Sequence, residues 1–345
     1  MKKILRRILI ALAVLSAILL LVYLAGPRPA QPQYAPPPPM AKAASLDALE
    51  TSLKQSETAE PGIKPGCEAT IIWADSLHKT RTPVVFVYFH GFGASHEEGA
   101  PVHQNIARTF GGNLLLSRLD EHGVNEGEHN LEELTADSYV ESGEKALQIA
   151  SQLGDSVVIL ATSGGAGLSL FLASRHPEIK SLVLWSPCVR LYSGMSGVLA
   201  GPWGLHIARA VRGGQHNDWA FKRPEMAAYW TNHQRFEGIV QFCTFLETAL
   251  VPETFAKIKC PVFVGYYYKD EAHQDMVVSV AAMRQMFGQL GTPAAQKREM
   301  AFPEANNHVI TCYMTSDDWS SVQQQSIGFL QDVVAIPLHT GAAVK

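Results

Sequence analysis

The chain has 345 residues, with 28 Lys and Arg against 32 Asp and Glu and a formal net charge of −4. This length is ample for one large α/β domain or two smaller ones with a sizeable core. The balanced charge carries no electrostatic footprint for nucleic acid, so no nucleic-acid partner is expected.

The first 26 residues predict a membrane helix. Eighteen uncharged residues, from Ile8 to Ala25, follow basic side chains at positions 2, 3, 6 and 7. As a helix they would span about 27 Å, close to the thickness of a bilayer core. The basic flank favours an orientation that leaves the rest of the chain on the periplasmic or extracellular side. We therefore expect residues 1–26 to be a single-pass anchor; a cleaved signal peptide of a secreted protein is the alternative, but Tyr23-Leu24-Ala25 is a poor cleavage site.

Residues 27–60 predict a linker and a lead-in. Seven prolines occur among the thirteen residues 27–39. Such a composition favours extended polyproline II, which would hold the next domain away from the membrane as a semi-rigid spacer. Residues 41–60 are polar with some helical spacing of Leu, so we expect them to pack loosely.

Residues 61–338 alternate between strand and helix patterns. Strands are expected at 67–73, 83–89, 113–117, 157–160, 180–186, 261–268 and 298–302, and helices at 102–110, 139–153, 277–290 and 319–334. This alternation predicts an α/β domain, with a mainly parallel central sheet and helices on both faces. The alternation lapses over about 188–255, which is rich in aromatic residues without a strand pattern. We interpret this insert as a mostly helical cap over the carboxyl edge of the sheet.

The stretch around Ser163 carries the strongest chemical signal. Branched apolar residues stop at Ala161-Thr-Ser-Gly-Gly165, and an apolar helical pattern then resumes. This predicts a strand, a sharp turn and a helix, with Ser163 at the apex between the small residues Ala161 and Gly165. The helix that follows would direct its amide groups and positive dipole end at the hydroxyl. A glycine-rich loop without chemistry is the alternative.

A serine hydroxyl needs a base and a group that orients the base. In an α/β sheet these partners come from loops after later strands. His308 follows the last short strand, and Asp270 and Asp275 follow the strand before it. The order Ser, acid, His is therefore available with either aspartate.

Three motifs together resemble the α/β-hydrolase fold superfamily, in particular its carboxylesterases and monoacylglycerol lipases, over about 61–338. Residues 161–165 resemble the nucleophile elbow, although Ala161 stands where the commonest pattern has Gly. The HGFGAS sequence at 90–95 resembles the HG-type oxyanion loop, and RLDEHG at 118–123 resembles the RLxxHG segment.

The resemblance implies a serine hydrolase. It makes Ser163 the nucleophile and His308 the base, and it forms the oxyanion hole from the backbone amides of Phe92 and Gly164. For the acid, Asp270 lies at the usual position, whereas Asp275 begins the usual D-x-V-V continuation into the helix. We prefer Asp275, with a five-residue loop extension before it.

The expected function is hydrolysis of a small or lipid-like carboxylic ester through an acyl-enzyme. An amidase, peptidase or thioesterase would use the same residues, and a non-catalytic anchored binding protein of the same fold is the other alternative. The GxGxxG pattern of dinucleotide-binding turns is not met. The acidic loop at 120–129 matches no closed metal site, and the five cysteines form no CxxC pair, so no metal or other cofactor is expected.

Overall fold

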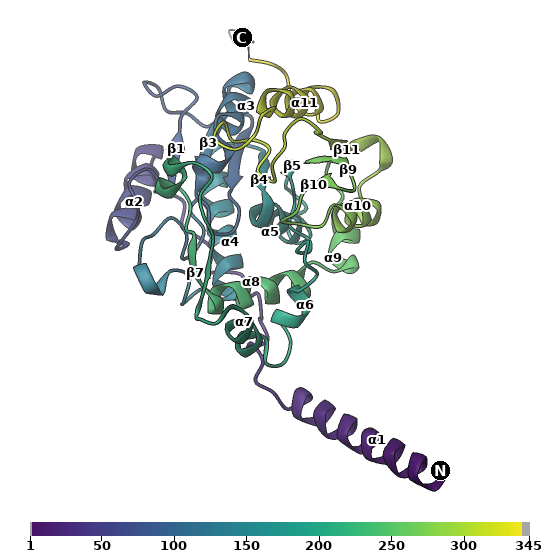
Figure 1. Cartoon of the computed structure of the whole chain (residues 1–345). Coiled ribbons are helices and arrows are strands. Elements are labelled where there is room, and N and C mark those ends of the chain that lie inside the picture. Colours follow the sequence, from purple (N-terminus) through teal and green to yellow (C-terminus); the bar gives the residue numbers. More distant parts are fainter. Residues whose placement is uncertain (1, 340–345) are drawn as a thin grey trace.

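A seven-stranded sheet forms the centre of the computed structural model, which describes residues 2–339 (Figure 1). The strand order is β1-β3-β2-β4-β5-β8-β11. All neighbouring strands are parallel except β1, which pairs with β3 in the antiparallel direction. The bounds are β1 Thr70–Ile72, β2 Val85–Phe89, β3 Asn113–Leu116, β4 Val157–Thr162, β5 Ser181–Trp185, β8 Val262–Tyr266 and β11 Lys297–Ala301. The predicted mainly parallel sheet is confirmed.

Helices cover both faces of this sheet, which explains why its central strands are apolar throughout. In β2, Val85 and Val87 face one core cluster while Phe86 and Tyr88 face the other. The second face is covered by α3 (Val102–Phe110) and α11 (Trp319–Asp332). The first face is covered by α4 (Ala136–Leu153), α5 (Ser163–Ala173) and α10 (Val280–Gln289).

The cap between β5 and β8 is mostly helical, as expected, but it also contains a β-hairpin that the sequence analysis missed. Its helices are α6 (Ser196–Leu199), α7 (Gly204–Arg212), α8 (Phe236–Ala249) and α9 (Pro252–Lys257), with a 3-10 turn, η3, at Pro224–Ala228. The hairpin pairs β6 (His216–Asp218) with β7 (His233–Arg235). These strands are three residues long and polar, so they show no hydrophobic alternation. Helix α8 joins the cap to the α/β domain, because its residues Phe242 and Phe245 are part of the hydrophobic core of that domain.

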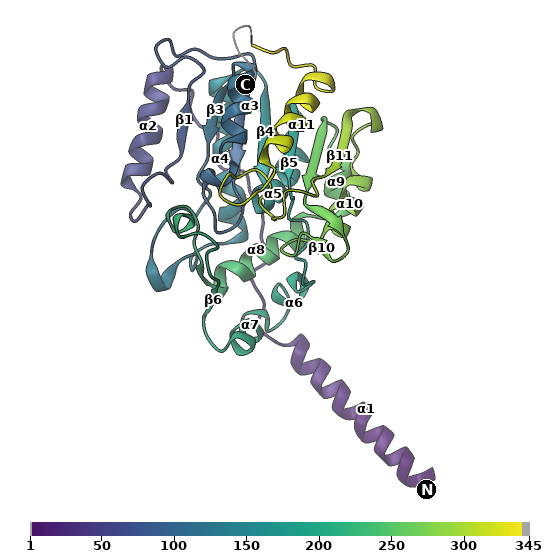
Figure 2. The same cartoon turned by 45° about the horizontal axis from the view of Figure 1, so that its top comes forward.

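Helix α1 (Lys2–Leu24) extends away from the domain and has no buried residue (Figures 1 and 2). It is long and apolar enough to cross a membrane. Its carboxyl end meets the cap at Trp203, whose indole nitrogen donates to the Val22 carbonyl at 3.1 Å. The Trp203 amide also donates to the Pro27 carbonyl at 2.8 Å. The cap therefore lies next to the point where α1 ends.

The proline-rich segment packs against the domain instead of forming the expected spacer. The Tyr34 ring contacts those of Phe171 and Phe245, with centroids 4.9 and 6.3 Å apart. Its hydroxyl lies 2.7 Å from Thr248 Oγ1, and its amide donates to Asp137 Oδ1 at 2.5 Å. A half-buried aromatic side chain packed against the core outweighs the preference of prolines for a solvated extended chain.

The lead-in is also better packed than expected. Helix α2 (Leu46–Ala59) begins at Ser45, whose side chain accepts a hydrogen bond from the Ala48 amide. Leu49 and Leu53 are buried in the core cluster beside α4. One face of α2 thus belongs to the domain, and the packed unit begins before residue 61.

All five cysteines are free. Burial raises the pKa of Cys243, Cys260 and Cys312 to about 12. Burial likewise raises the pKa of Cys67 and Cys188. Because the thiolate is the reactive form, these thiols are weak nucleophiles at neutral pH.

Candidate active site

Ser163 lies at a strained turn between β4 and α5. Its φ angle is 51°, in the left-handed region that non-glycine residues adopt only at a cost. Ala161 is fully buried in β4. A β-carbon at Gly165 would lie 2.4 Å from the Phe89 carbonyl oxygen, so only glycine allows this close approach to β2. The local sequence thus holds the Ser163 side chain at the carboxyl end of the sheet.

The loop that follows β2 lies directly against this turn. A β-carbon at Gly91 would lie 3.0 Å from Ser163 Cβ, and one at Gly164 would lie 3.1 Å from the Phe92 nitrogen. The Gly164 amide is in the first turn of α5, where an N–H has no partner within the helix. The Phe92 ring stacks on Phe242 of α8, with centroids 4.6 Å apart. The Phe92 nitrogen therefore lies close to Gly164, in the loop that packs beside Ser163.

His308 is paired with Asp275 and not with Asp270. His308 Nδ1 lies 2.6 Å from Asp275 Oδ2. Asp275 is buried, and its Oδ1 accepts hydrogen bonds of 2.9 and 3.0 Å from the amides of Val277 and Val278. Asp270 is exposed and bonds instead to the imidazole and amide of His273.

A hairpin between the two aspartates explains why Asp275, and not Asp270, reaches His308. Strand β9 (Tyr268–Asp270) pairs with β10 (His273–Gln274), which reverses the chain and leaves Asp270 at an exposed position. The Asp275 amide then donates to the Tyr267 carbonyl at 3.1 Å, which returns the chain to the end of β8. The five residues that precede Asp275 form most of this hairpin.

The surroundings of His308 define its protonation. A carboxylate oxygen can only accept a hydrogen bond, so the 2.6 Å contact with Asp275 Oδ2 assigns the proton to Nδ1 of His308. Nε2 then has a free lone pair. Burial acts to lower the pKa of His308, but the carboxylates of Asp275 and, to a smaller degree, Glu98 raise it above the ordinary value overall. The Ser186 hydroxyl donates to the His308 carbonyl at 2.7 Å and holds this loop.

Glu98, in the 3-10 turn η1 (His96–Gly99), is a buried acid that the sequence analysis missed. Its Oε2 accepts a 2.6 Å hydrogen bond from the Gly91 amide. The Tyr88 hydroxyl lies 3.3 Å from the same oxygen and 3.0 Å from Thr162 Oγ1, next to Ser163. The Glu98 carbonyl accepts from Thr311 Oγ1, three residues beyond His308. Burial raises the pKa of Glu98 to about 7. No sequence motif marks this residue.

The HG and RLDEHG motifs hold together the two loops beside the site, which follow β2 and β3. His90 Nε2 accepts a hydrogen bond from the Leu119 amide at 3.1 Å. Arg118 is paired with Glu57 of α2 at 2.8 Å. His122 Nδ1 lies 2.6 Å from the Asp120 carbonyl oxygen. Burial lowers the pKa of His90 well below its ordinary value and that of His122 to about 4, so both rings are neutral at pH 7. These residues join the loops after β2 and β3.

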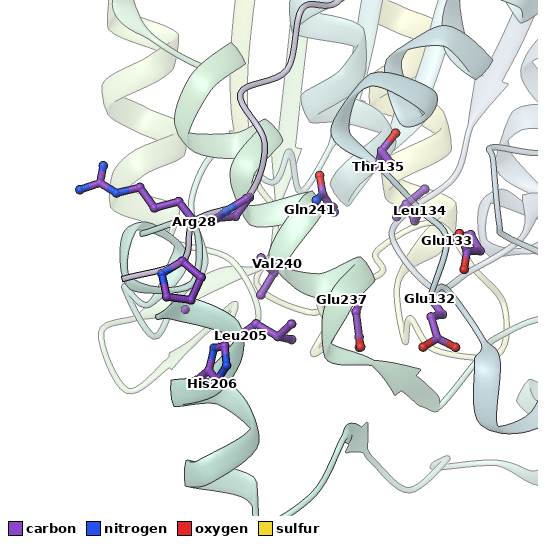
Figure 3. A pocket seen from close by; sticks show the side chains of 13 residues that line it. Arg28, Glu132, Glu133, Leu134, Thr135, Leu205, His206, Glu237, Val240 and Gln241 are labelled. Atoms are coloured by element: carbon purple, nitrogen blue, oxygen red, sulfur yellow. The ribbon is translucent and has the colours of Figure 1, made fainter. Parts of the chain in front are cut away.

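A cavity of about 300 Å³ lies elsewhere, between the proline-rich segment and the cap (Figure 3). Arg28 and His206 lie on one side of it and the acidic residues Glu132, Glu133 and Glu237 on the other. Ser163 and His308 are not among the residues that line it. The cavity therefore lies where the proline-rich segment, the cap and the segment just before α4 meet.

The comparisons with known proteins agree with this architecture. No family model and no curated protein sequence matches the chain. Among solved structures, one described with LipS and LipT, two metagenome-derived lipolytic enzymes, is 17% identical, covers 78% of this chain and 99% of its own, and has a TM-score of 0.62. Est1E from Butyrivibrio proteoclasticus, with ferulic acid bound, is 15% identical over 78% and 95% of the two chains, with a TM-score of 0.51. Paleococcus ferrophilus monoacylglycerol lipase is 14% identical over 76% and 99%, with a TM-score of 0.50.

These likenesses define the class of fold. The protein has the α/β-hydrolase fold, as its motifs predicted, and its structural neighbours include lipases and esterases.

Proposed function

We propose that the protein is a serine hydrolase that cleaves a carboxylic ester. Ser163 is the nucleophile, His308 the general base and Asp275 the group that orients His308. The observation that carries this proposal is the 2.6 Å hydrogen bond between His308 and buried Asp275, at the sheet edge that also carries Ser163 on its strained turn. The lipolytic and esterase neighbours support the same bond type.

In the proposed reaction, His308 Nε2 removes the hydroxyl proton as Ser163 Oγ attacks the carbonyl carbon. The tetrahedral intermediate collapses when His308 returns that proton to the leaving alcohol, which leaves an acyl group on Ser163. Water, activated by the same imidazole, then releases the acid. Asp275 keeps the imidazole in the required tautomer and stabilises the imidazolium that forms in each half.

The negative oxygen of each intermediate would be bound by the backbone amides of Phe92 and Gly164. Loss of one such donor typically reduces the rate by about 100-fold or more. The contacts of the loop after β2 with Ser163 support this role, because they hold the donors in position before the substrate arrives. The chemistry needs no cofactor.

Two other functions remain alternatives. An amidase, peptidase or thioesterase would use the same side chains, and the leaving group decides between them. A non-catalytic binding protein would keep the fold without an activated serine. The hydrogen-bonded His308–Asp275 pair favours catalysis, since a binding site does not need an oriented base.

We also propose that α1 is a single-pass anchor that leaves the domain on the periplasmic or extracellular side. Its length, its apolar composition and the basic residues at its start support this topology. Secretion after cleavage is the alternative, and the amino-terminal sequence of the mature protein distinguishes the two.

A fluorophosphonate probe, which reacts with activated serines, tests the proposal. The full-length protein in detergent should be labelled, and Ser163→Ala and His308→Ala should abolish labelling. Ser52→Ala, which changes an exposed serine of α2, is the matched control and should be labelled like wild type. Folded wild-type protein that is not labelled would favour the binding-protein alternative. If the protein is labelled, a panel of esters, thioesters and amides would identify the bond that it cleaves.

A further inference from the structure

The cap hairpin brings together two histidines, His216 and His233, that are far apart in the sequence. In the β6–β7 pair, Asp218 lies directly opposite His233. His216 is two residues before Asp218, so both side chains lie on the same face of the hairpin. The rings of His216 and His233 are stacked, with centroids 3.8 Å apart and planes inclined by 20°.

Glu128 reaches the same place from another part of the chain. It belongs to a 3-10 turn, η2 (Gly127–His129), in the long loop that follows β3. Its Oε2 lies 3.7 Å from His216 Nε2 and 3.5 Å from His233 Nε2. The three candidate ligand atoms lie within 4.8 Å of one another. Ligands bound at about 2.0–2.1 Å in a tetrahedral zinc site are separated by roughly 3.3 Å, so the two contacts of Glu128 already lie close to the spacing that such a site needs.

Asp218 orients the His233 ring, as carboxylates often do for histidines that bind a metal. Its Oδ1 accepts a 2.5 Å hydrogen bond from His233 Nδ1. Nε2 of His233 is inaccessible to solvent and has no hydrogen-bond partner. A carboxylate on the far nitrogen of a metal-ligating histidine is a common outer-shell arrangement, because it fixes the ring and makes the ligating nitrogen more basic.

We propose that Glu128, His216 and His233 bind one divalent ion of the zinc type, with Asp218 as the outer-shell carboxylate and water at the fourth position. Two imidazoles and one carboxylate suit zinc or a related first-row ion better than calcium or magnesium, which prefer oxygen ligands. Binding requires the stacked rings to open, and it replaces the 2.9 Å contact between His216 Nε2 and the Glu128 carbonyl oxygen.

The site joins two segments that the backbone connects only distantly. The loop with Glu128 continues from the RLDEHG motif behind Ser163, and the hairpin belongs to the cap. A bound ion would therefore fix the cap to the body of the domain and contribute to stability, because binding to the folded state alone shifts the folding equilibrium. This proposal is independent of the reaction proposed for Ser163.

A zinc titration of the full-length protein, after treatment with a chelator, tests the site. Calorimetry should show one Zn²⁺ per chain, with Co²⁺ giving a visible absorption band and Zn²⁺ raising the melting temperature. The titration is run at about pH 8, because the carboxylates of Asp218 and Glu128 raise the pKa of His233 and a proton competes with the metal. Absence of stoichiometric binding in wild type would overturn the proposal.

Variants make the test specific. His216→Ala and His233→Ala should abolish binding, and Asp218→Asn should weaken it by about 10- to 100-fold. His78→Ala is the matched control, because His78 also pairs with an aspartate but lies in an exposed loop outside the cap, and it should bind like wild type. Should a hairpin variant fail to fold, Glu128→Gln changes a side chain that is 77% exposed, and its unaltered zinc affinity would count against the site.

Discussion

The Gly91 amide donates a 2.6 Å hydrogen bond to Glu98 Oε2, so a buried carboxyl group supports the loop that carries Phe92. A β-carbon at Gly91 would lie 2.8 Å from the other Glu98 oxygen and 3.0 Å from Ser163 Cβ. The charge of Glu98 is therefore coupled to the candidate site without Glu98 being one of the reacting groups. We expect it to act as a positioning residue.

The first prediction concerns the pH dependence of activity. An ionised Glu98 helps raise the pKa of His308, so Glu98→Gln should lower that pKa. Because His308 must be neutral to act as a base, the acid limb of the kcat/KM profile should move to lower pH in the variant. The profile would be measured with a soluble ester between about pH 5 and 9. An acid limb at the wild-type position would contradict the coupling.

Glu98 should also make stability depend on pH. Its pKa is raised by burial from 4.5 to about 7, so between these two pH values the folded state binds more protons than the unfolded state. Stability is therefore lost as pH rises from about 4.5 to 7, and the full penalty is present above that range. The Glu98→Gln variant lacks this titration. As pH rises from about 5 to 8, its unfolding free energy should therefore increase by roughly 2–3 kcal/mol relative to that of wild type, measured by urea unfolding. The exposed control Glu225→Gln should show the same pH dependence of unfolding free energy as wild type. If Glu98→Gln showed that same pH dependence, the prediction would be wrong.

The two aspartates should differ sharply in their effect on rate. Asp275→Asn removes the acceptor that sets the His308 tautomer, so kcat should fall by about 10⁴-fold. Asp270→Asn changes an exposed side chain that contacts His273 and should leave kcat within about twofold of wild type. Circular dichroism would verify that both variants fold. Equal losses in the two variants would reject Asp275 as the orienting acid.

The turn at Ser163 should not tolerate a side chain at Gly165. Gly165→Ala would place a methyl group 2.4 Å from the Phe89 carbonyl oxygen, and the clash with rigid backbone should cost about 3 kcal/mol or more in unfolding free energy. Gly288→Ala is the matched control. Gly288 lies within α10, where an added methyl group would have no atom within 4 Å, so this variant should gain about 0.5–1 kcal/mol. A stable, active Gly165→Ala protein would contradict the geometry of the turn.

The docked linker should be released by the loss of Tyr34. Tyr34→Ala removes the ring contacts with Phe171 and Phe245, so limited proteolysis within residues 27–40 should become at least about tenfold faster. Tyr34→Phe keeps the ring and loses only the hydrogen bond to Thr248, so its cleavage should lie between the two. Tyr192→Ala, at an exposed position in the cap, should behave like wild type. Fast cleavage of wild type in this segment would mean that it is a free spacer.

The sequence by itself determined the strands of the central sheet and the helices that cover it, because local patterns decide them, whereas the two short polar hairpins were not predicted. Helix α3 has the predicted bounds of Val102–Phe110, with its apolar residues on one face and Gly111 in the left-handed conformation at its end. The strand, turn and helix around Ser163 were likewise predicted, since the apolar run of β4 and the small residues after it are contiguous. Buried strands between helices then allow few arrangements other than a parallel sheet.

Only the tertiary structure decided which groups meet. Asp270 and Asp275 are five residues apart and chemically equivalent, and a short hairpin brings one of them to His308. Nothing near Glu98 in the sequence indicates that the loops after β2 and β11 will bury it. The composition of the proline-rich segment describes its preference in water, whereas its docking depends on an aromatic surface formed by α5 and α8. Propensity and periodicity act over neighbouring residues, but burial, pKa and partners depend on segments that approach each other only in the folded chain.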